Sequence, residues 1–141
     1  LLKSLNQLKA NNNISSTVVL HRSRSGLNEI QSFLEGNGYD TQILLDSGEI
    51  DFERESIKIC TLSSVKGLEF DNVFIIDLND DILPYPPGFN GEDDELHIST
   101  ERRLLYTSMT RARERLYLLS SGEPSRYLTE IDENLLVKAD N

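Results

Sequence analysis

Two short segments of the chain carry side chains whose types and spacing suit the binding of phosphate. Residues 63–69, Ser-Ser-Val-Lys-Gly-Leu-Glu, combine hydroxyl groups and backbone amides with a glycine that allows close backbone approach. Residues 106–113, Tyr-Thr-Ser-Met-Thr-Arg-Ala-Arg, contain guanidinium groups, which stay charged and can hold phosphate oxygens at two points. A third segment, His-Arg-Ser-Arg at residues 21–24, follows an apolar run. The sequence therefore indicates a local anion site.

The chain as a whole is strongly acidic, with a formal net charge of −10 at pH 7. A protein that binds nucleic acid by itself usually has a basic surface, because neutralising phosphates supplies much of its affinity. We therefore expect weak DNA binding by this chain alone. Acidic residues gather at 46–55 and 92–95, whereas arginines gather in one short stretch, where local charge outweighs the net value. These arginines are Arg102, Arg103, Arg111, Arg113 and Arg115.

Alternating helical and strand patterns place these segments in an α/β domain. Apolar residues at helical spacing predict helices at 1–8, 27–34, 100–113 and 128–137, the third of them capped by Ser99 or Thr100. Apolar runs predict strands at 17–20, 41–45, 57–61, 73–76 and 116–119. Irregular or polar stretches are expected at 11–13, 46–55, 77–99 and 138–141. We predict a three-layer sandwich with a mostly parallel sheet over residues 14–141, after an N-terminal helix and linker at 1–13.

The two phosphate-suited segments, extended to residues 61–76 and 101–113, resemble the fifth and sixth conserved motifs of superfamily 1 DNA helicases of the UvrD/Rep/PcrA group. The resemblance implies the second RecA-like motor domain of such a helicase. Its fold is of the P-loop NTPase type, although the sequence contains no Gly-x-x-x-x-Gly-Lys-Ser/Thr segment of its own. Relatives carry a large insertion before the fifth motif, and only residues 38–57 stand at that place here.

The resemblance also implies roles for individual residues of the fifth and sixth motifs. Glu69 matches the acid that contacts the nucleotide ribose, and Lys66 and Gly67 belong to the same nucleotide-binding turn. Arg111 matches the catalytic arginine that reaches the γ-phosphate of ATP. The hydroxyl-bearing residues that line the DNA path in relatives match Thr61, Ser63 and Ser64, with Ser63 where the family often has histidine.

The segment after the first predicted strand resembles the fourth motif of the same family. There an aromatic residue stacks on adenine and an arginine approaches the γ-phosphate. His21 stands in place of the usual tyrosine and would stack on the base, and Arg22 matches the catalytic arginine. An ordinary residue at the end of a strand is the other interpretation of His21.

The resemblance therefore implies a helicase or translocase that hydrolyses ATP with Mg²⁺ and moves along single-stranded DNA in the 3′ to 5′ direction, with DNA repair as its setting. ATP would be held mainly by the N-terminal RecA-like domain of the same parent chain, so we expect no activity from this chain alone and no metal ligands in it. Apolar runs fall short of the roughly 20 residues that span a membrane, and the single cysteine, Cys60, is expected to be buried. We expect a cytoplasmic protein.

Two alternatives use the same residues differently. A degenerate motor domain could serve as a protein-interaction module, which the acidic composition and the proline-rich residues 83–89 favour. The retained Lys66, Glu69 and Arg111 speak against it, because an interaction module does not need these chemical groups. A receiver domain phosphorylated on Asp77 would need an acidic pair after the first strand, where residues 21–24 offer basic groups instead.

Overall fold

The computed structural model describes residues 1–11, 14–44, 53–65, 67–85 and 95–138. Their helices are α1 (Leu2–Ala10), α2 (Arg24–Gly36) and α3 (Glu95–Met109), followed by two 3₁₀ helices, η1 (Arg126–Glu130) and η2 (Glu133–Leu135). Their strands are β1 (Thr17–His21), β2 (Thr41–Ile43), β3 (Ile57–Thr61), β4 (Phe70–Ile75) and β5 (Ala112–Leu118). None of the helices in these ranges is long and apolar enough to cross a membrane.

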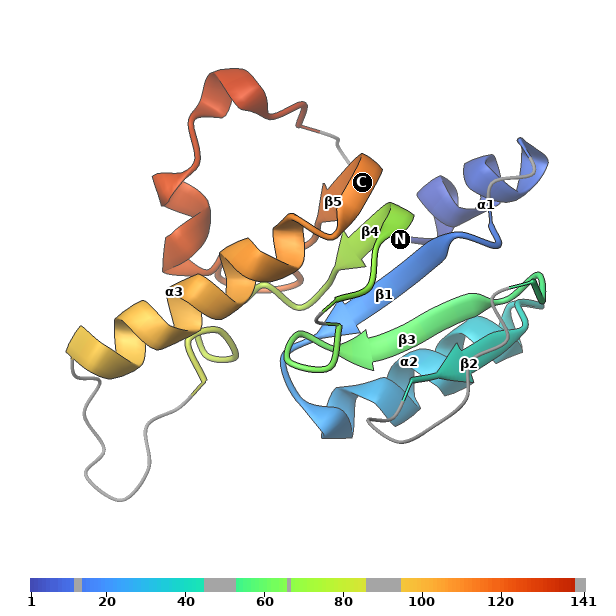
Figure 1. Ribbon diagram of the computed structural model, residues 1–141, viewed down its shortest axis with the longest axis horizontal. Helices are drawn as coiled ribbons and strands as arrows, with labels where there is room; N and C mark the ends of the chain where they lie inside the picture. The colour runs from blue at the N-terminus through green and yellow to red at the C-terminus, as the bar shows by residue number, and fades with distance from the viewer. Residues whose placement is uncertain (12–13, 45–52, 66, 86–94, 139–141) are drawn as a thin grey trace.

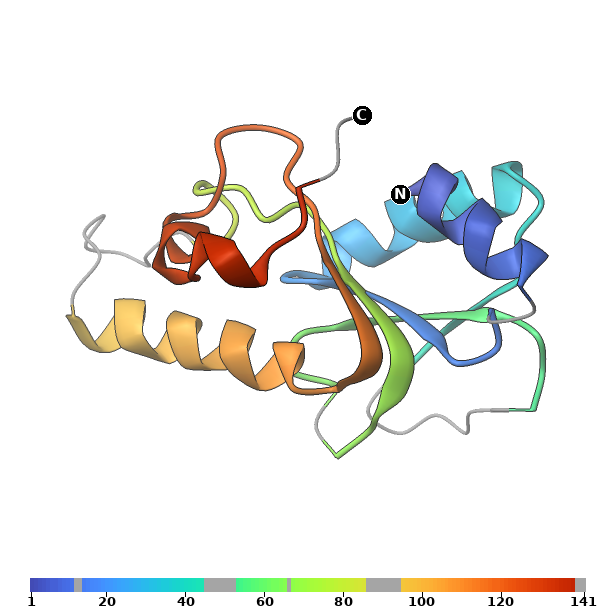
Figure 2. The same ribbon diagram turned by 90° about the horizontal axis from the view of Figure 1, so that it is seen from above.

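The described strands form one parallel sheet in the order β2-β3-β1-β4-β5 (Figure 1). Alternate residues of the central strands face opposite sides. Val18 and Leu20 pack in the same cluster as Leu105 of α3, whereas Val19 packs in the cluster that contains Leu5 of α1 and residues of α2. Figure 2 shows α1 and α2 on one side of the sheet and α3 with the 3₁₀ helices on the other. The predicted three-layer α/β sandwich with a parallel sheet is confirmed.

The local reason for the end of α2 is a glycine in the left-handed region. Gly38 has φ of 88°, its N–H donates to Glu35 O at 3.1 Å, and Tyr39 N–H donates to Leu34 O at 3.0 Å. This pattern is a Schellman motif, and the buried Leu34 and Tyr39 supply its apolar contact. The predicted helix stop at residues 36–38 is confirmed. Phe33, an apolar residue of the predicted helix at 27–34, is 47% exposed.

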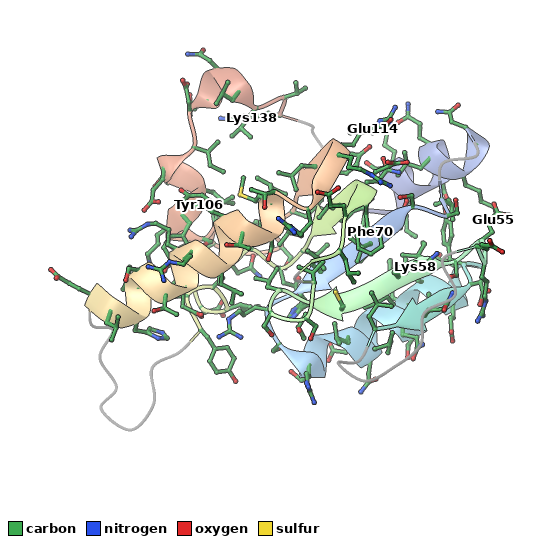
Figure 3. All side chains as sticks on the ribbon, in the orientation of Figure 1. Glu55, Lys58, Phe70, Tyr106, Glu114 and Lys138 are labelled. Carbon is green, nitrogen blue, oxygen red and sulfur yellow. The ribbon has the colours of Figure 1, made fainter. Side chains whose placement is uncertain are left out.

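The amino ends of the strands are held by a buried lysine. Lys58 of β3 is fully buried and donates from Nζ to the carbonyl oxygens of Ser15, Arg54 and Ser56 at 2.8, 3.1 and 2.9 Å (Figure 3). Buried polar groups persist only when they are hydrogen-bonded, so this lysine fixes the segments that enter β1 and β3. The neighbouring Cys60 is also buried, as predicted.

The predicted boundaries of the third helix and of the last strand are wrong. The helix begins at Glu95 and ends at Met109, and β5 begins at Ala112. Ser99 and Thr100 do not cap it, because their hydroxyl groups donate to Leu96 O inside the helix. Arg111 therefore lies between the helix and β5, where its carbonyl oxygen accepts a hydrogen bond from Phe70 N at 2.9 Å.

The predicted helix at 128–137 is also wrong. The chain turns extended at Ile131, and the Asp132 side chain accepts a hydrogen bond from Asn134 N, which starts the separate 3₁₀ turn of η2. Leu135 and Val137 are exposed rather than buried on a stripe. At the other end of the chain, Leu5 and Leu8 of α1 are buried against the sheet. The 1–13 and 14–141 division remains a prediction.

Candidate functional site

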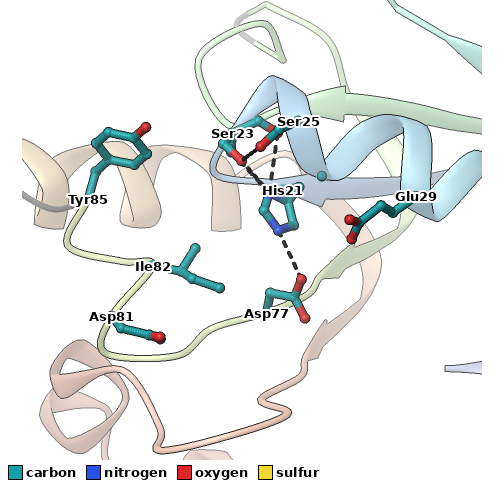
Figure 4. A pocket seen from close by; sticks show the side chains of 9 residues that line it. His21, Ser23, Ser25, Glu29, Asp77, Asp81, Ile82 and Tyr85 are labelled. Atoms are coloured by element: carbon teal, nitrogen blue, oxygen red, sulfur yellow. Dashed lines mark hydrogen bonds and ion pairs between the residues drawn. The ribbon is translucent and has the colours of Figure 1, made fainter.

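A pocket of about 300 Å³ opens at the carboxyl edge of the sheet, where β1 and β4 end and α2 begins (Figure 4). In parallel α/β sheets, ligands bind outside the carboxyl ends of the strands. The pocket is lined by His21, Ser23, Ser25, Gly26, Glu29, Asp77, Asp81, Ile82 and Tyr85. Its carboxylate-bearing residues, Glu29, Asp77 and Asp81, make it unsuited to phosphate.

His21 forms the floor of this pocket and is held at both ring nitrogens. Its Nε2 donates to Asp77 Oδ2 at 2.9 Å, and its Nδ1 accepts a hydrogen bond from Ser23 N at 3.0 Å. The ring also lies against Gly26, where a Cβ atom would come within 2.5 Å of Nδ1. Because the backbone N–H occupies Nδ1, the neutral ring carries its proton on Nε2. His21 is 5% exposed, and its stacking on adenine stays a prediction.

Asp77 joins the carboxyl ends of the central strands. Its Oδ1 accepts a hydrogen bond from Ser121 Oγ at 3.2 Å, while Oδ2 accepts the bond from His21. The residue has φ of 52°, in the left-handed region that aspartate tolerates better than most side chains. Asp77 thereby links the segments after β1 and β5 to the end of β4. Both oxygens of its carboxylate are thus engaged by side chains of the protein.

Arg22 makes a bidentate ion pair with Glu101 of α3. Its Nε and Nη2 atoms donate to the two carboxylate oxygens at 2.9 and 3.0 Å, and Glu101 is only 3% exposed. Glu101 also accepts a hydrogen bond from Tyr85 N at 2.6 Å, and the guanidinium lies 4.7 Å from the Tyr85 ring centre. The γ-phosphate role of Arg22 stays a prediction, and in this conformation its guanidinium is engaged by the protein.

The predicted DNA contacts lie at the same edge, in the turn that follows β3. Thr61 Oγ1 donates to Ser64 Oγ at 2.8 Å and accepts a hydrogen bond from Ser64 N, which closes the turn. Leu62 N donates to His21 O at 3.1 Å, so this turn adjoins the end of β1. Ser63 is exposed at its tip. The structure thus brings together Thr61, Ser63 and Ser64 with His21 and Arg22.

The remaining predicted nucleotide contacts lie at the opposite, amino edge of the sheet. Glu69 is exposed and directly precedes β4, whose Phe70 bonds to Arg111 O. Gly67 has φ of 80°, the left-handed conformation that glycine allows in the turn before β4. Lys66 falls outside the described residues. Glu69 and Arg111 therefore adjoin each other across β4 and β5.

Strand register separates Arg22 from Arg111. Thr17 of β1 pairs with Asn72, which pairs with Arg115, whereas Arg111 precedes the level of Phe70. Arg22 lies beyond the carboxyl end of β1, and Arg111 lies before the level of its amino end. The strand from Thr17 to His21, about 13 Å long, separates the two levels. The structure does not bring both arginines to one phosphate in this conformation.

Arg111 differs from most other arginines of the described chain in its partners. Its Nη2 donates to Thr110 Oγ1 at 3.0 Å, while its Nε is buried with no acceptor among the described residues. Most other arginines of the described chain are paired with carboxylates: Arg22, Arg54, Arg102, Arg113, Arg115 and Arg126. A guanidinium without a carboxylate partner suits an external anion. The described residues contain no cluster of three or more His, Cys, Asp or Glu that could hold a metal ion.

Sequence reasoning missed Glu101 and Tyr85. The pairing of Glu101 with Arg22 joins positions 79 residues apart, which no local pattern reveals. Asp77 did carry a signal, because an acid directly after an apolar strand commonly faces a ligand site. No sequence pattern identified His21 as the partner of Asp77.

Comparison with known proteins places the chain in a family. Residues 23–123 match the model of the UvrD-like helicase C-terminal domain. ATP-dependent DNA helicase PcrA of Staphylococcus aureus is 36% identical over 108 residues, which cover 69% of this chain and 14% of the relative. The PcrA of Staphylococcus epidermidis is 35% identical over the same coverage of each chain. The chain thus spans only a small part of the length of these curated relatives.

Two solved structures share the fold. The C-terminal domain of a possible DNA helicase from Lactobacillus plantarum has a TM-score of 0.72 and 21% identity, covering 95% of this chain and 72% of that one. The SWI2/SNF2 ATPase core of Sulfolobus solfataricus, in complex with double-stranded DNA, has a TM-score of 0.58 and 11% identity, covering 86% and 24%. The RecA-like fold and the two helicase motifs agree with the family match, and the chain belongs to the UvrD-like helicase C-terminal domain family.

Proposed function

We propose that this chain is the second motor domain of an ATP-dependent DNA helicase or translocase, which completes a nucleotide site held mainly by another domain of its parent. The observation that carries the proposal is Arg111, whose guanidinium has no carboxylate partner among the described residues and whose carbonyl oxygen bonds to Phe70, the residue after the exposed Glu69. A guanidinium so placed would hold the γ-phosphate oxygens, and Glu69 would hold the ribose. Bound ATP with Mg²⁺ supplies the phosphoryl group, and the metal ligands lie in the N-terminal domain.

The contribution of Arg111 is electrostatic. A preorganised guanidinium stabilises the charge that develops on the transferring phosphoryl group, and an arginine in this role raises turnover by about 10³- to 10⁵-fold. Single-stranded DNA would cross the opposite edge of the sheet, along Thr61, Ser63 and Ser64. Because the γ-phosphate interacts differently with open and closed arrangements of the two domains, hydrolysis would move the strand, with 3′ to 5′ direction inferred from the family resemblance.

The test is ATP hydrolysis by the full-length parent, with and without single-stranded DNA. Replacement Arg111→Ala should lower turnover by about 10³-fold or more, with unchanged thermal unfolding. Arg113→Ala is the matched control, because it removes the same charge two positions away. In the wild type Arg113 pairs with Asp71 at 2.9 Å on the surface. Equal turnover of the Arg111 variant and the wild type would refute the assignment. A parent without any turnover would favour a docking module instead. This chain alone should hydrolyse no ATP.

A further inference from the structure

The ion pair between Arg22 and Glu101 fixes α3 to the carboxyl edge of the sheet. Glu101 is nearly buried and accepts three hydrogen bonds, two from Arg22 and one from Tyr85 N. Replacing a buried ion pair by apolar residues is often neutral for stability, so its main effect is to fix position. Here it fixes the middle of α3 against the end of β1.

A second bond attaches α3 to the same edge farther along the helix. Ser108 is fully buried, and its hydroxyl lies 3.2 Å from Leu62 O and 2.9 Å from Leu104 O. Leu62 stands between Thr61 and Ser63, the predicted DNA contacts. From Glu101 to Ser108 the helix rises about 10 Å, roughly two turns. The helix is therefore held at two points by the elements that carry the DNA edge.

Arg111 lies three residues beyond the second of these points. The backbone continues from Ser108 through the last helical turn, and Arg111 N donates to Ser108 O at 3.1 Å. A displacement of α3 would therefore move Arg111 with it. Such a displacement matters for catalysis, because a misplacement of about 1 Å at a reacting group can cost about 10²-fold in rate.

We infer that Glu101 and Ser108 are positioning residues that couple single-stranded DNA at the carboxyl edge to the placement of Arg111 at the amino edge. The inference rests on the proposed function and adds the path of communication within this domain. A strand that shifts the turn at residues 61–64, which bonds to Ser108 and to His21 beside Arg22, pulls α3 as a rigid body. By linkage, nucleotide held by Arg111 changes DNA affinity by the same factor by which DNA changes nucleotide affinity.

A matched control lies next to Glu101 on the same helix. Arg102 makes a comparable bidentate ion pair with Glu130, with contacts of 2.9 Å from Nε and Nη2. This pair joins α3 to η1 on the surface and touches neither the DNA edge nor Arg111. Glu130→Gln removes the carboxylate that pairs with Arg102 of α3 and leaves the contacts of Glu101 and Ser108 in place.

The experiment measures the binding of a fluorescent oligothymidylate to the full-length parent, with and without a non-hydrolysable ATP analogue. In the wild type the analogue should change DNA affinity by a factor on the order of 5 to 150. We expect this factor to fall toward 1 in Glu101→Gln and in Ser108→Ala, together with loss of DNA-stimulated turnover. Glu130→Gln should keep both the full factor and the full DNA-stimulated turnover.

The outcomes separate the inference from the function on which it rests. An unchanged factor in Ser108→Ala and in any folded Glu101→Gln protein overturns the inference alone. Equal losses in Glu130→Gln also overturn it, because they would reveal general loosening of α3. Ser108→Ala makes a small change in volume and decides the matter if Glu101→Gln fails to fold. A wild type without strand-stimulated turnover refutes the proposed function and the inference together.

Discussion

Gly26→Ala in this chain should destabilise the fold, against the usual effect of this substitution in a helix. Alanine inside a helix is ordinarily more stable than glycine by about 0.5–1 kcal/mol. At position 26 the added Cβ would lie 2.5–2.6 Å from three atoms of the His21 ring. The ring has little freedom to retreat, because hydrogen bonds to Asp77 and Ser23 hold both of its nitrogens.

The expected loss of stability depends on what the His21 ring does. The ring either stays in place and overlaps the new Cβ atom, or it moves and loses hydrogen bonds. Overpacking a tight site costs about 1–3 kcal/mol. Displacing the ring would instead weaken its bond to the Asp77 carboxylate, and hydrogen bonds to charged groups contribute about 1.5–3 kcal/mol. After the gain in helix propensity is subtracted, we expect a net loss of about 1–3 kcal/mol in the free energy of unfolding.

The assay is urea unfolding followed by far-ultraviolet circular dichroism at pH 7. With an m-value of about 2 kcal/mol per molar urea, Gly26→Ala should lower the midpoint by roughly 0.5–1.5 M. Gly36→Ala is the control on the same helix, because its Cβ would meet nothing within 4 Å, and it should be neutral or stabilising. Adding His21→Ala to Gly26→Ala should recover part of the loss. A midpoint for Gly26→Ala at or above that of the wild type would refute the reasoning.

Two further predictions concern buried and paired charges. Lys58→Met should lower the free energy of unfolding by about 2–4 kcal/mol in the same urea assay, because three carbonyl oxygens lose their shared donor; a smaller loss than that of Ile59→Val would contradict it. The Arg102 guanidinium, followed by the Tyr106 hydroxyl, lowers the pKa of Glu130 in the folded protein. The ion pair of Glu130 should therefore stabilise the fold at pH values above the unfolded pKa of about 4.3, and this stabilisation should be lost as the pH falls through the lower folded pKa. The urea midpoints of Glu130→Gln and of the wild type should then converge in acid.

Much of the fold could be predicted because its signals are local. The β-branched run at 17–20 and the apolar run at 57–61 became β1 and β3, and the glycines at 36 and 38 ended α2 as expected. Each of these patterns is read within a few residues. The boundaries around Arg111 could not be predicted, since the bond from Phe70 N to Arg111 O decides where β5 joins the sheet. That bond joins segments about forty residues apart, and periodicity within 100–113 carries no trace of it.

The sequence predicts a set of candidate site residues but not their arrangement. The resemblance to helicase motifs singled out Arg22, Glu69 and Arg111 and attached all three to one nucleotide. Strand register places Arg22 beyond the carboxyl end of β1 and the other two before the amino ends of β4 and β5. The positions of these residues along the sheet are set by the register of the paired strands, which the sequence does not show. The engagement of Arg22 by Glu101 likewise depends on how α3 crosses the sheet.

The acidic composition and the unpaired arginine are consistent with one another if the domain must open and close. A closing domain works by differential affinity, because a group that held nucleotide equally well in both states would shift nothing. The net charge of −10 and the carboxylates paired with Arg22, Arg102 and Arg113 leave little general attraction for phosphate. Arg111 keeps an unpaired Nε, and under the proposed function its interaction would gain strength only when a second domain presents the phosphate to it. Under the proposed function, the same acidity that we expect to weaken DNA or nucleotide binding by the isolated chain would make its closure dependent on the γ-phosphate.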